Sequence, residues 1–148
     1  MIQRDFIKRQ IEELGRAIGK VISDILKLQE RGKLNEGVTM SQEILKSSFD
    51  LNIEKILSLQ IENFIETILS DTKLSPVHLN SLGDLIYVTA GLFEQKREPE
   101  NAKKMYQKVL LIFKYVDQTE KTFSVERNNK IKVIEKYLGI INLRKGDK

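Results

Sequence analysis

The side chains that most often perform chemistry are scarce in this sequence. Histidine occurs once, at His78, and cysteine is absent, which excludes disulfides, thiolate zinc sites and cysteine nucleophiles together. With one histidine and no cysteine, zinc and haem sites lack ligands. We interpret His78 as a solvent-facing or helix-capping residue, because it follows the helix start that we predict at Ser75.

Paired carboxylates and glycine-rich loops give no catalytic motif either. Glu62 and Glu66 lie one helical turn apart, but no Glu-x-x-His motif accompanies them, as a di-iron site requires. The sequence contains no Gly-x-x-x-x-Gly-Lys-Ser/Thr loop and no Gly-x-Gly-x-x-Gly after a strand. We therefore predict a protein that is not an enzyme and that uses no metal or cofactor.

Composition places the chain among helix-rich globular proteins. Hydrophobic residues make up 41% and charged residues 31% of 148 residues, which favours a single domain over residues 1–148. No stretch approaches the roughly 20 apolar residues that span a bilayer, and charges interrupt the start where a signal peptide needs an apolar core. The sequence predicts a cytoplasmic protein without a membrane segment.

The first 30 residues form the strongest pattern. Apolar residues recur at steps of four and three: Ile7, Ile11, Leu14, Ile18, Val21, Ile25 and Leu28. This seam predicts one helix over residues 3–30, with Gly32 at its C-cap. We favour an intramolecular core along the seam; the alternative is that part of it forms a homodimer contact.

Two glycines lie inside this predicted helix. Gly15 and Gly19 are four residues apart on a face next to the seam. Since glycine in a helix costs about 1 kcal/mol relative to alanine, the pair predicts close approach of another backbone. Arg16 and Lys20 rule out a membrane dimer motif.

Helical signals continue to the end of the chain. Thr39 and Gln42 fit a capping box for a second helix, residues 50–58 predict a short helical turn or a connector, and Ser58 predicts the cap of a fourth helix. Ser75 with Pro76 predicts a helix to about Arg97, and Pro99 starts another to about Asp117. Ser124 then caps a last helix with one stripe at Ile131, Ile134, Leu138 and Ile141 and a second at Val133, Tyr137 and Ile140. The fold class is all-α.

The late pair of predicted helices resembles a tetratricopeptide repeat. Ile86, Thr89, Ala90 and Phe93, followed by Ala102, Tyr106 and Val109, have its order of large and small residues. A looser copy pairs Ile11, Leu14, Gly15 and Ile18 with Met40, Ile44 and Ser47, with about thirteen residues more between them than a standard repeat. The arrangement over residues 3–118 is similar to an uncharacterised bacterial family with tetratricopeptide-like hairpins, a domain of unknown function. The resemblance implies tetratricopeptide-like hairpins with a C-terminal capping helix.

That resemblance also implies a binding face. The first helix of each hairpin would line a concave surface with these residues: Arg9, Glu12, Arg16, Lys20, Asp84, Tyr87 and Glu94. Mixed charge around one aromatic suits an extended peptide, with Tyr87 as the anchor and basic side chains contacting carboxylates. The alternative is that each of the seven is an ordinary exposed polar group on a helix.

Positive charge gathers at the C-terminus. From Lys121 onward, eight basic residues face three acidic ones, whereas residues 1–120 are close to neutral. The alternative function is therefore a nucleic-acid-associated protein using this basic helix. We favour a solvated helix face with residues 142–148 as a basic tail. The function that we expect is a non-catalytic protein–protein interaction module, with nucleic acid a less favoured partner.

Overall fold

The computed structural model describes residues 2–71, 74, 76–121 and 123–146; the side chains of residues 2–4, 7, 71 and 140–146 are excepted. Within these ranges the chain is helical and contains no strand, which confirms the all-α prediction. The α-helices are α1 (Ile2–Glu30), α2 (Leu34–Phe49), α3 (Ile53–Ser58), α4 (Phe64–Asp71), α5 (Leu79–Gln95), α6 (Pro99–Glu120) and α7 (Val125–Gly146). Two 3-10 turns, η1 (Ile61–Asn63) and η2 (Pro76–His78), precede α4 and α5. No helix in the described part of the chain is both long enough and apolar enough to cross a bilayer.

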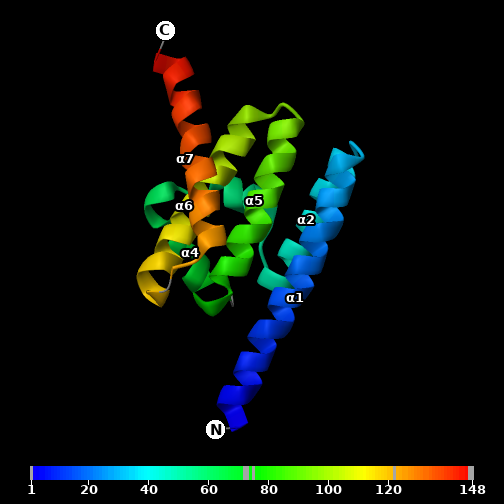
Figure 1. Cartoon of the computed structure of the whole chain (residues 1–148), viewed down its shortest axis with the longest axis vertical. Helices are drawn as coiled ribbons and strands as arrows, with labels where there is room; N and C mark the ends of the chain where they lie inside the picture. Colours follow the sequence, from blue (N-terminus) through cyan, green and yellow to red (C-terminus); the bar gives the residue numbers. More distant parts are fainter. Residues whose placement is uncertain (1, 72–73, 75, 122, 147–148) are drawn as a thin grey trace.

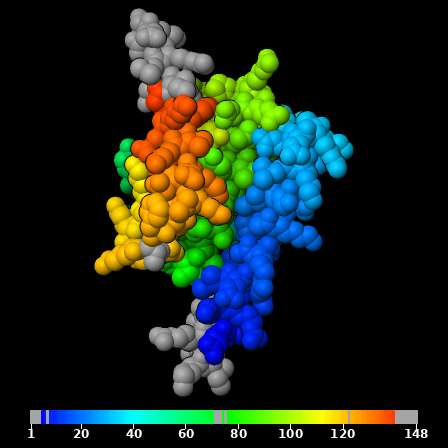
Figure 2. Space-filling model, viewed as in Figure 1, coloured from blue at the N-terminus to red at the C-terminus, as the bar shows by residue number. Residues whose placement is uncertain are grey.

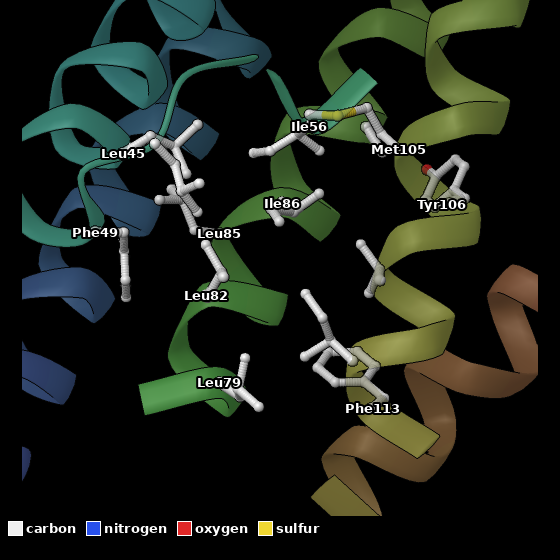
Figure 3. Close-up of a cluster of buried hydrophobic side chains, with 14 of the residues drawn as sticks. Leu45, Phe49, Ile56, Leu79, Leu82, Leu85, Ile86, Met105, Tyr106 and Phe113 are labelled. Carbon is white, nitrogen blue, oxygen red and sulfur yellow. The ribbon is translucent and has the colours of Figure 1, made fainter. Parts of the chain in front are cut away.

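Helix α5 is the centre of the molecule. It packs against α6 on one side and against α1 and α2 on the other, while α7 packs along α6 (Figure 1). The segment between α2 and α5 does not lie between the α1–α2 pair and the α5–α6 pair, because its elements α3, η1 and α4 pack on α6. Buried side chains fill the space between these helices, among them Leu45 and Phe49 of α2, Leu82 and Leu85 of α5, and Phe113 of α6 (Figure 3).

The turns that join α1 to α2 and α5 to α6 have the same backbone structure. Gly32 (φ 74°) and Arg97 (φ 64°) both adopt the left-handed conformation that ends a helix. Four backbone N–H to C=O hydrogen bonds of the first turn recur in the second, shifted by 65 residues: Arg31–Lys27, Gly32–Gln29, Lys33–Leu28 and Gly37–Lys33, then Lys96–Leu92, Arg97–Glu94, Glu98–Phe93 and Ala102–Glu98. Each pair of helices, α1 with α2 and α5 with α6, is therefore joined by a turn of the same backbone geometry.

Because the two turns have the same backbone structure, introducing glycine at one and removing it from the other should change the free energy of unfolding in opposite directions. We expect Arg97→Gly to raise the free energy of unfolding by about 0.5–1 kcal/mol, because glycine adopts a positive φ without a Cβ penalty. Gly32→Ala should lower it by about 1 kcal/mol for the same reason. Urea denaturation of both variants measures the difference; a destabilised Arg97→Gly variant would mean that the arginine side chain contributes more than its backbone strain costs.

The first hairpin uses a different part of α1 from the one that the sequence predicted. Only residues 31–33 join α1 to α2, so α2 packs beside the second half of α1. The residues in excess of a standard repeat are therefore the N-terminal half of α1 and not a long connection between the two helices. The buried small residue equivalent to Ala102 is Gly37, where a Cβ would lie 3.1 Å from Leu92. The predicted match through Gly15 and Ser47 is wrong, since Ser47 is exposed.

The prediction for Gly15 and Gly19 is wrong as well. A Cβ atom at either position would have nothing within 4 Å outside its own helix, so no other described segment approaches there. The N-terminal half of α1 extends beyond the rest of the molecule (Figure 1) and keeps Phe6 59% exposed. The homodimer contact through the first helix stays a prediction.

Three predicted helix starts also need correction. Helix α2 begins at Leu34, so Thr39 lies inside it and its hydroxyl donates to the carbonyl of Asn35 at 3.0 Å. The side-chain oxygen of Gln42 instead accepts from the backbone N–H of Ile53 at 2.9 Å, at the start of α3. Ser58 is the last residue of α3 and does not cap α4; its hydroxyl donates to the carbonyl of Lys55 at 3.1 Å. The third correction is that η2 precedes α5, so the regular helix starts at Leu79 instead of Pro76; the predicted cap at Ser75 lies outside the described residues.

Predictions for the end of the chain are partly confirmed. The backbone N–H of Arg127 donates to the Ser124 hydroxyl at 3.2 Å, which confirms that cap. Ile131 and Ile134 are buried as predicted, but Val133 is 51% exposed, so the second stripe does not pack along its whole length. The side chains of residues 140 and 141, which belong to the two stripes, lie outside the described residues.

Candidate functional site

A hollow of about 320 Å³ lies on the face where α1, α5 and α6 meet. Its lining residues are Leu26 and Gln29 of α1, Tyr87, Val88, Gly91, Glu94 and Gln95 of α5, and Tyr106 of α6. On this face α5 appears as a strip between α1 and α7 (Figure 2). Residues far apart in the sequence therefore meet at one concave place.

Glycine at position 91 leaves the space open. A Cβ atom at Gly91 would lie 3.8 Å from the side-chain nitrogen of Gln29 and 3.9 Å from the hydroxyl of Tyr106, both ordinary contact distances. Beside it, the amide nitrogen of Gln29 donates to the side-chain oxygen of Gln95 at 2.9 Å. This bond fixes two amides that span from α1 to α5.

Three tyrosines form the aromatic part of the site. The ring of Tyr106 lies edge-on to Tyr87, with centroids 5.9 Å apart, and tilted against Tyr137 at 4.8 Å. The hydroxyl of Tyr106 donates to a carboxylate oxygen of Glu94 at 2.9 Å. Burial and, after it, the charge of Glu94 raise the pKa of Tyr106 and of Tyr87 above the ordinary value. Both phenols therefore stay protonated at neutral pH and serve as neutral surfaces.

An ion pair attaches α7 to α5 beside Tyr87. The ammonium of Lys130 lies 2.8 Å from a carboxylate oxygen of Asp84 and 5.5 Å from the centroid of the Tyr87 ring. Glu94 is the one carboxylate among the residues that line the hollow, and the neighbouring charges of Lys130 and Asp84 neutralise each other. The hollow therefore carries negative charge next to aromatic rings.

The structure brings together three of the seven residues predicted to bind. Asp84, Tyr87 and Glu94 share one face of α5, although Asp84 and Glu94 already have partners within the fold. The remaining four are exposed on α1 and line none of the hollow: Arg9, Glu12, Arg16 and Lys20. At 1.5 Å per residue, Lys20 is about 9 Å and Arg9 about 25 Å along α1 from Leu26. A role in binding stays a prediction for all seven.

Sequence reasoning missed the residues that other helices contribute. Tyr106 fits the helix-packing position of the repeat pattern, which gives no sign of its contact with Glu94 and Tyr137. Lys130 looks like one more residue of the basic C-terminus until α7 is placed against α5. Spacing within one helix carries no information on such pairs, which lie 12 to 46 residues apart.

Part of the C-terminal positive charge is used inside the fold. The guanidinium of Arg127 is in a residue only 5% exposed and donates to Asp117 at 2.6 Å and Asn80 at 3.1 Å. Lys130 pairs with Asp84, whereas Lys132 and Lys136 are exposed on α7. Two of the eight basic residues from position 121 onward thus hold α7 in place.

The site offers binding contacts and no catalytic set. Its lining contains one carboxylate, two phenols and two amides, without a nucleophile beside a base. The described residues include no group of three or more His, Asp or Glu that could hold a metal ion. His78 lies half-buried on η2, where burial lowers its pKa below the ordinary value.

Comparison with known proteins adds no relative. No family model matches the chain, and no curated protein or solved structure gives a significant match. The similarity to a bacterial family with helical hairpins therefore stays an expectation from the sequence.

Proposed function

We propose that this protein is a non-catalytic protein–protein interaction module that binds an extended peptide in the hollow between α1, α5 and α6. The observation that carries the proposal is the set of contacts around Gly91, where Tyr87, Tyr106 and Glu94 surround an open floor. The buried Tyr106 and the half-buried Tyr87 hold each other in place and give a large contact surface at low entropic cost.

The recurring turn supports a tetratricopeptide-like arrangement. Gly37 and Ala102 occupy equivalent buried positions after identical turns, as the small residue of such a repeat does. Helices α1 and α5 are the first helices of the two hairpins, and they line the proposed binding face together. In this interpretation α7 is the capping helix that covers α6.

The charge of the hollow determines the peptide that fits it. Glu94 carries the negative charge, and the half-buried Tyr87 ring, which has the ammonium of Lys130 5.5 Å from its centroid, attracts cations. We therefore propose a peptide with a lysine or arginine as its anchor, in place of the acidic peptide that Arg9 and Arg16 indicate on sequence grounds alone.

A substitution at Gly91 tests this proposal without removing a contact. Peptides are selected from a random display library against the full chain, and their affinities are measured by fluorescence anisotropy. Gly91→Leu fills the hollow and should weaken binding at least tenfold. Gly91→Ala, the matched control, should bind within about threefold of the parent and unfold at a higher temperature, because alanine favours the helix by about 1 kcal/mol.

Circular dichroism must show that both variants remain folded. Selected peptides should contain a basic residue, and replacing it by glutamine should reproduce the loss seen with Gly91→Leu. Equal binding by the parent and a folded Gly91→Leu variant would contradict the proposal, as would a selection that yields no peptide.

A further inference from the structure

A second hollow, of about 570 Å³, lies on the other side of α6. It is formed between α6 and residues 57–62, the segment that joins α3 to η1. Lys104 and Lys108 line it, and both are two residues from Tyr106, which places them about 200° around the helix from the first hollow. The two hollows are therefore separate sites.

The Lys108 side chain is buried along most of its length, and its ammonium has no anionic partner. The residue is 3% exposed, and it forms no ion pair or hydrogen bond within the described part of the chain. Its ammonium lies 6.0 Å from the centroid of the buried Phe64 ring, which compensates part of the lost hydration. Partial removal of an ammonium from water without a counter-charge disfavours the folded state, so such a group marks a place where an anion would be stabilised.

Lys104 adds a second positive charge to the same hollow. It lies one helical turn before Lys108 and is exposed. Burial, and to a lesser degree the charge of Lys104, lower the pKa of Lys108. Each of these positive charges disfavours the protonated form of the other lysine in the free protein. One dianion placed between the two ammonium groups would stabilise both.

The other polar groups of the hollow leave this charge uncompensated. Glu62 also lines it, yet it forms no ion pair with Lys104 or Lys108. The Ser58 hydroxyl donates its proton to the carbonyl of Lys55 at 3.1 Å. Donors on the lining thus comprise two ammonium groups together with the side-chain amides of Gln60 and Gln107.

We propose that this hollow binds the phosphate group of a small molecule between the ammonium groups of Lys104 and Lys108. A phosphate monoester carries between 1.5 and 2 negative charges at about pH 7, which matches two lysines better than one carboxylate does. Lysine acts as a compact point charge towards phosphate, and amides can donate to the remaining oxygens. The proposed peptide groove on the other side of α6 is independent of this site.

Titration with inorganic phosphate tests the site. The full chain, labelled with ¹³C at the lysine ε-carbons, is titrated at constant ionic strength with phosphate, acetate or chloride. We expect saturable shifts of the Lys104 and Lys108 signals with phosphate alone. Lys108→Met should weaken phosphate binding at least tenfold and Lys104→Gln severalfold, whereas Lys114→Gln, an exposed position elsewhere on α6, should leave it unchanged.

Melting temperatures distinguish a variant that has lost phosphate binding from one that has lost its fold. Lys108→Met retains the apolar stem and removes the charge, so the free variant should melt at or above the temperature of the parent. Phosphate should raise the melting temperature of the parent and not that of Lys108→Met. Shifts that chloride reproduces, an equal response to acetate, or unchanged phosphate binding by both folded lysine variants would overturn the proposal.

Discussion

Gly83→Ala is expected to lower the free energy of unfolding by about 2 kcal/mol. A Cβ atom at Gly83 would lie 2.5 Å from Cε1 of Phe113 and 3.1 Å from Cγ2 of Ile112, both in fully buried residues. Overpacking of a filled core costs about 1–3 kcal/mol, and this contact is closer than real Cβ atoms make. So close a contact belongs at the upper end of that range, and subtracting the roughly 1 kcal/mol that alanine gains in a helix interior leaves about 2 kcal/mol.

Gly91→Ala provides the matched comparison eight residues later in α5. Its Cβ meets only contacts of 3.8 Å and 3.9 Å, so the same substitution should stabilise by about 0.5–1 kcal/mol. Phe113→Leu gives a second control, because it should make Gly83→Ala less costly than in the parent. Equal effects of alanine at positions 83 and 91 in urea denaturation would show that α5 and α6 can move apart without loss.

The glycines show where sequence reasoning about this fold reaches its limit. A glycine inside a predicted helix indicates that a side chain is disfavoured, but the pattern does not identify the neighbour. The sequence predicts a close approach at Gly15 and Gly19, yet they lie on a face of α1 that no other described segment approaches, although Ile18 between them is buried. The close approaches are at Gly37 and Gly83, whose neighbours Leu92 and Phe113 come from other helices.

Helix existence was predictable because it depends on local periodicity. The seam from Ile7 to Leu28 places α1 within one residue at its start, and Ser124 caps α7 as predicted. Helix pairing was less accessible: matching α1 to α2 through Gly15 used the wrong half of a long helix. The identical hydrogen bonds around Gly32 and Arg97 identify the pairing, and the sequences of the two turns hide it because glycine is replaced by arginine.

The candidate site, like the fold, could be predicted only where it depends on residues of one helix. Tyr87 and Glu94 could be selected because they share one face of a predicted helix. The hollow itself depends on Gln29 of α1 and Tyr106 of α6, whose positions relative to α5 are set by packing over the whole molecule. Lys108 was missed because a lysine on an amphipathic helix is ordinarily solvated, and its spacing does not predict the neighbouring segment 57–62 or the Phe64 ring.

A buried hydroxyl pair should hold the first hairpin against the second. Ser41 of α2 and Thr89 of α5 are fully buried and hydrogen-bonded to each other. The Thr89 hydroxyl also lies 2.8 Å from the carbonyl of Leu85, to which it donates its proton. Since a hydroxyl has one proton, Ser41 is the donor and Thr89 the acceptor in the bond between the helices.

This assignment predicts unequal effects of the two single substitutions. Thr89→Val leaves the buried O–H of Ser41 without an acceptor and should cost about 2–3 kcal/mol, whereas Ser41→Ala should cost only about 1 kcal/mol because Thr89 keeps its bond to Leu85. In the double variant no donor is stranded, so Ser41→Ala should reduce the cost of Thr89→Val by about 1 kcal/mol. Urea denaturation of the four proteins measures this coupling. Additive effects, or a Thr89→Val variant as stable as Ser41→Ala, would contradict the assignment. Ser41 would then have another acceptor, such as a carbonyl one turn earlier in α2, and the hydroxyl pair would not determine how the two hairpins pack together.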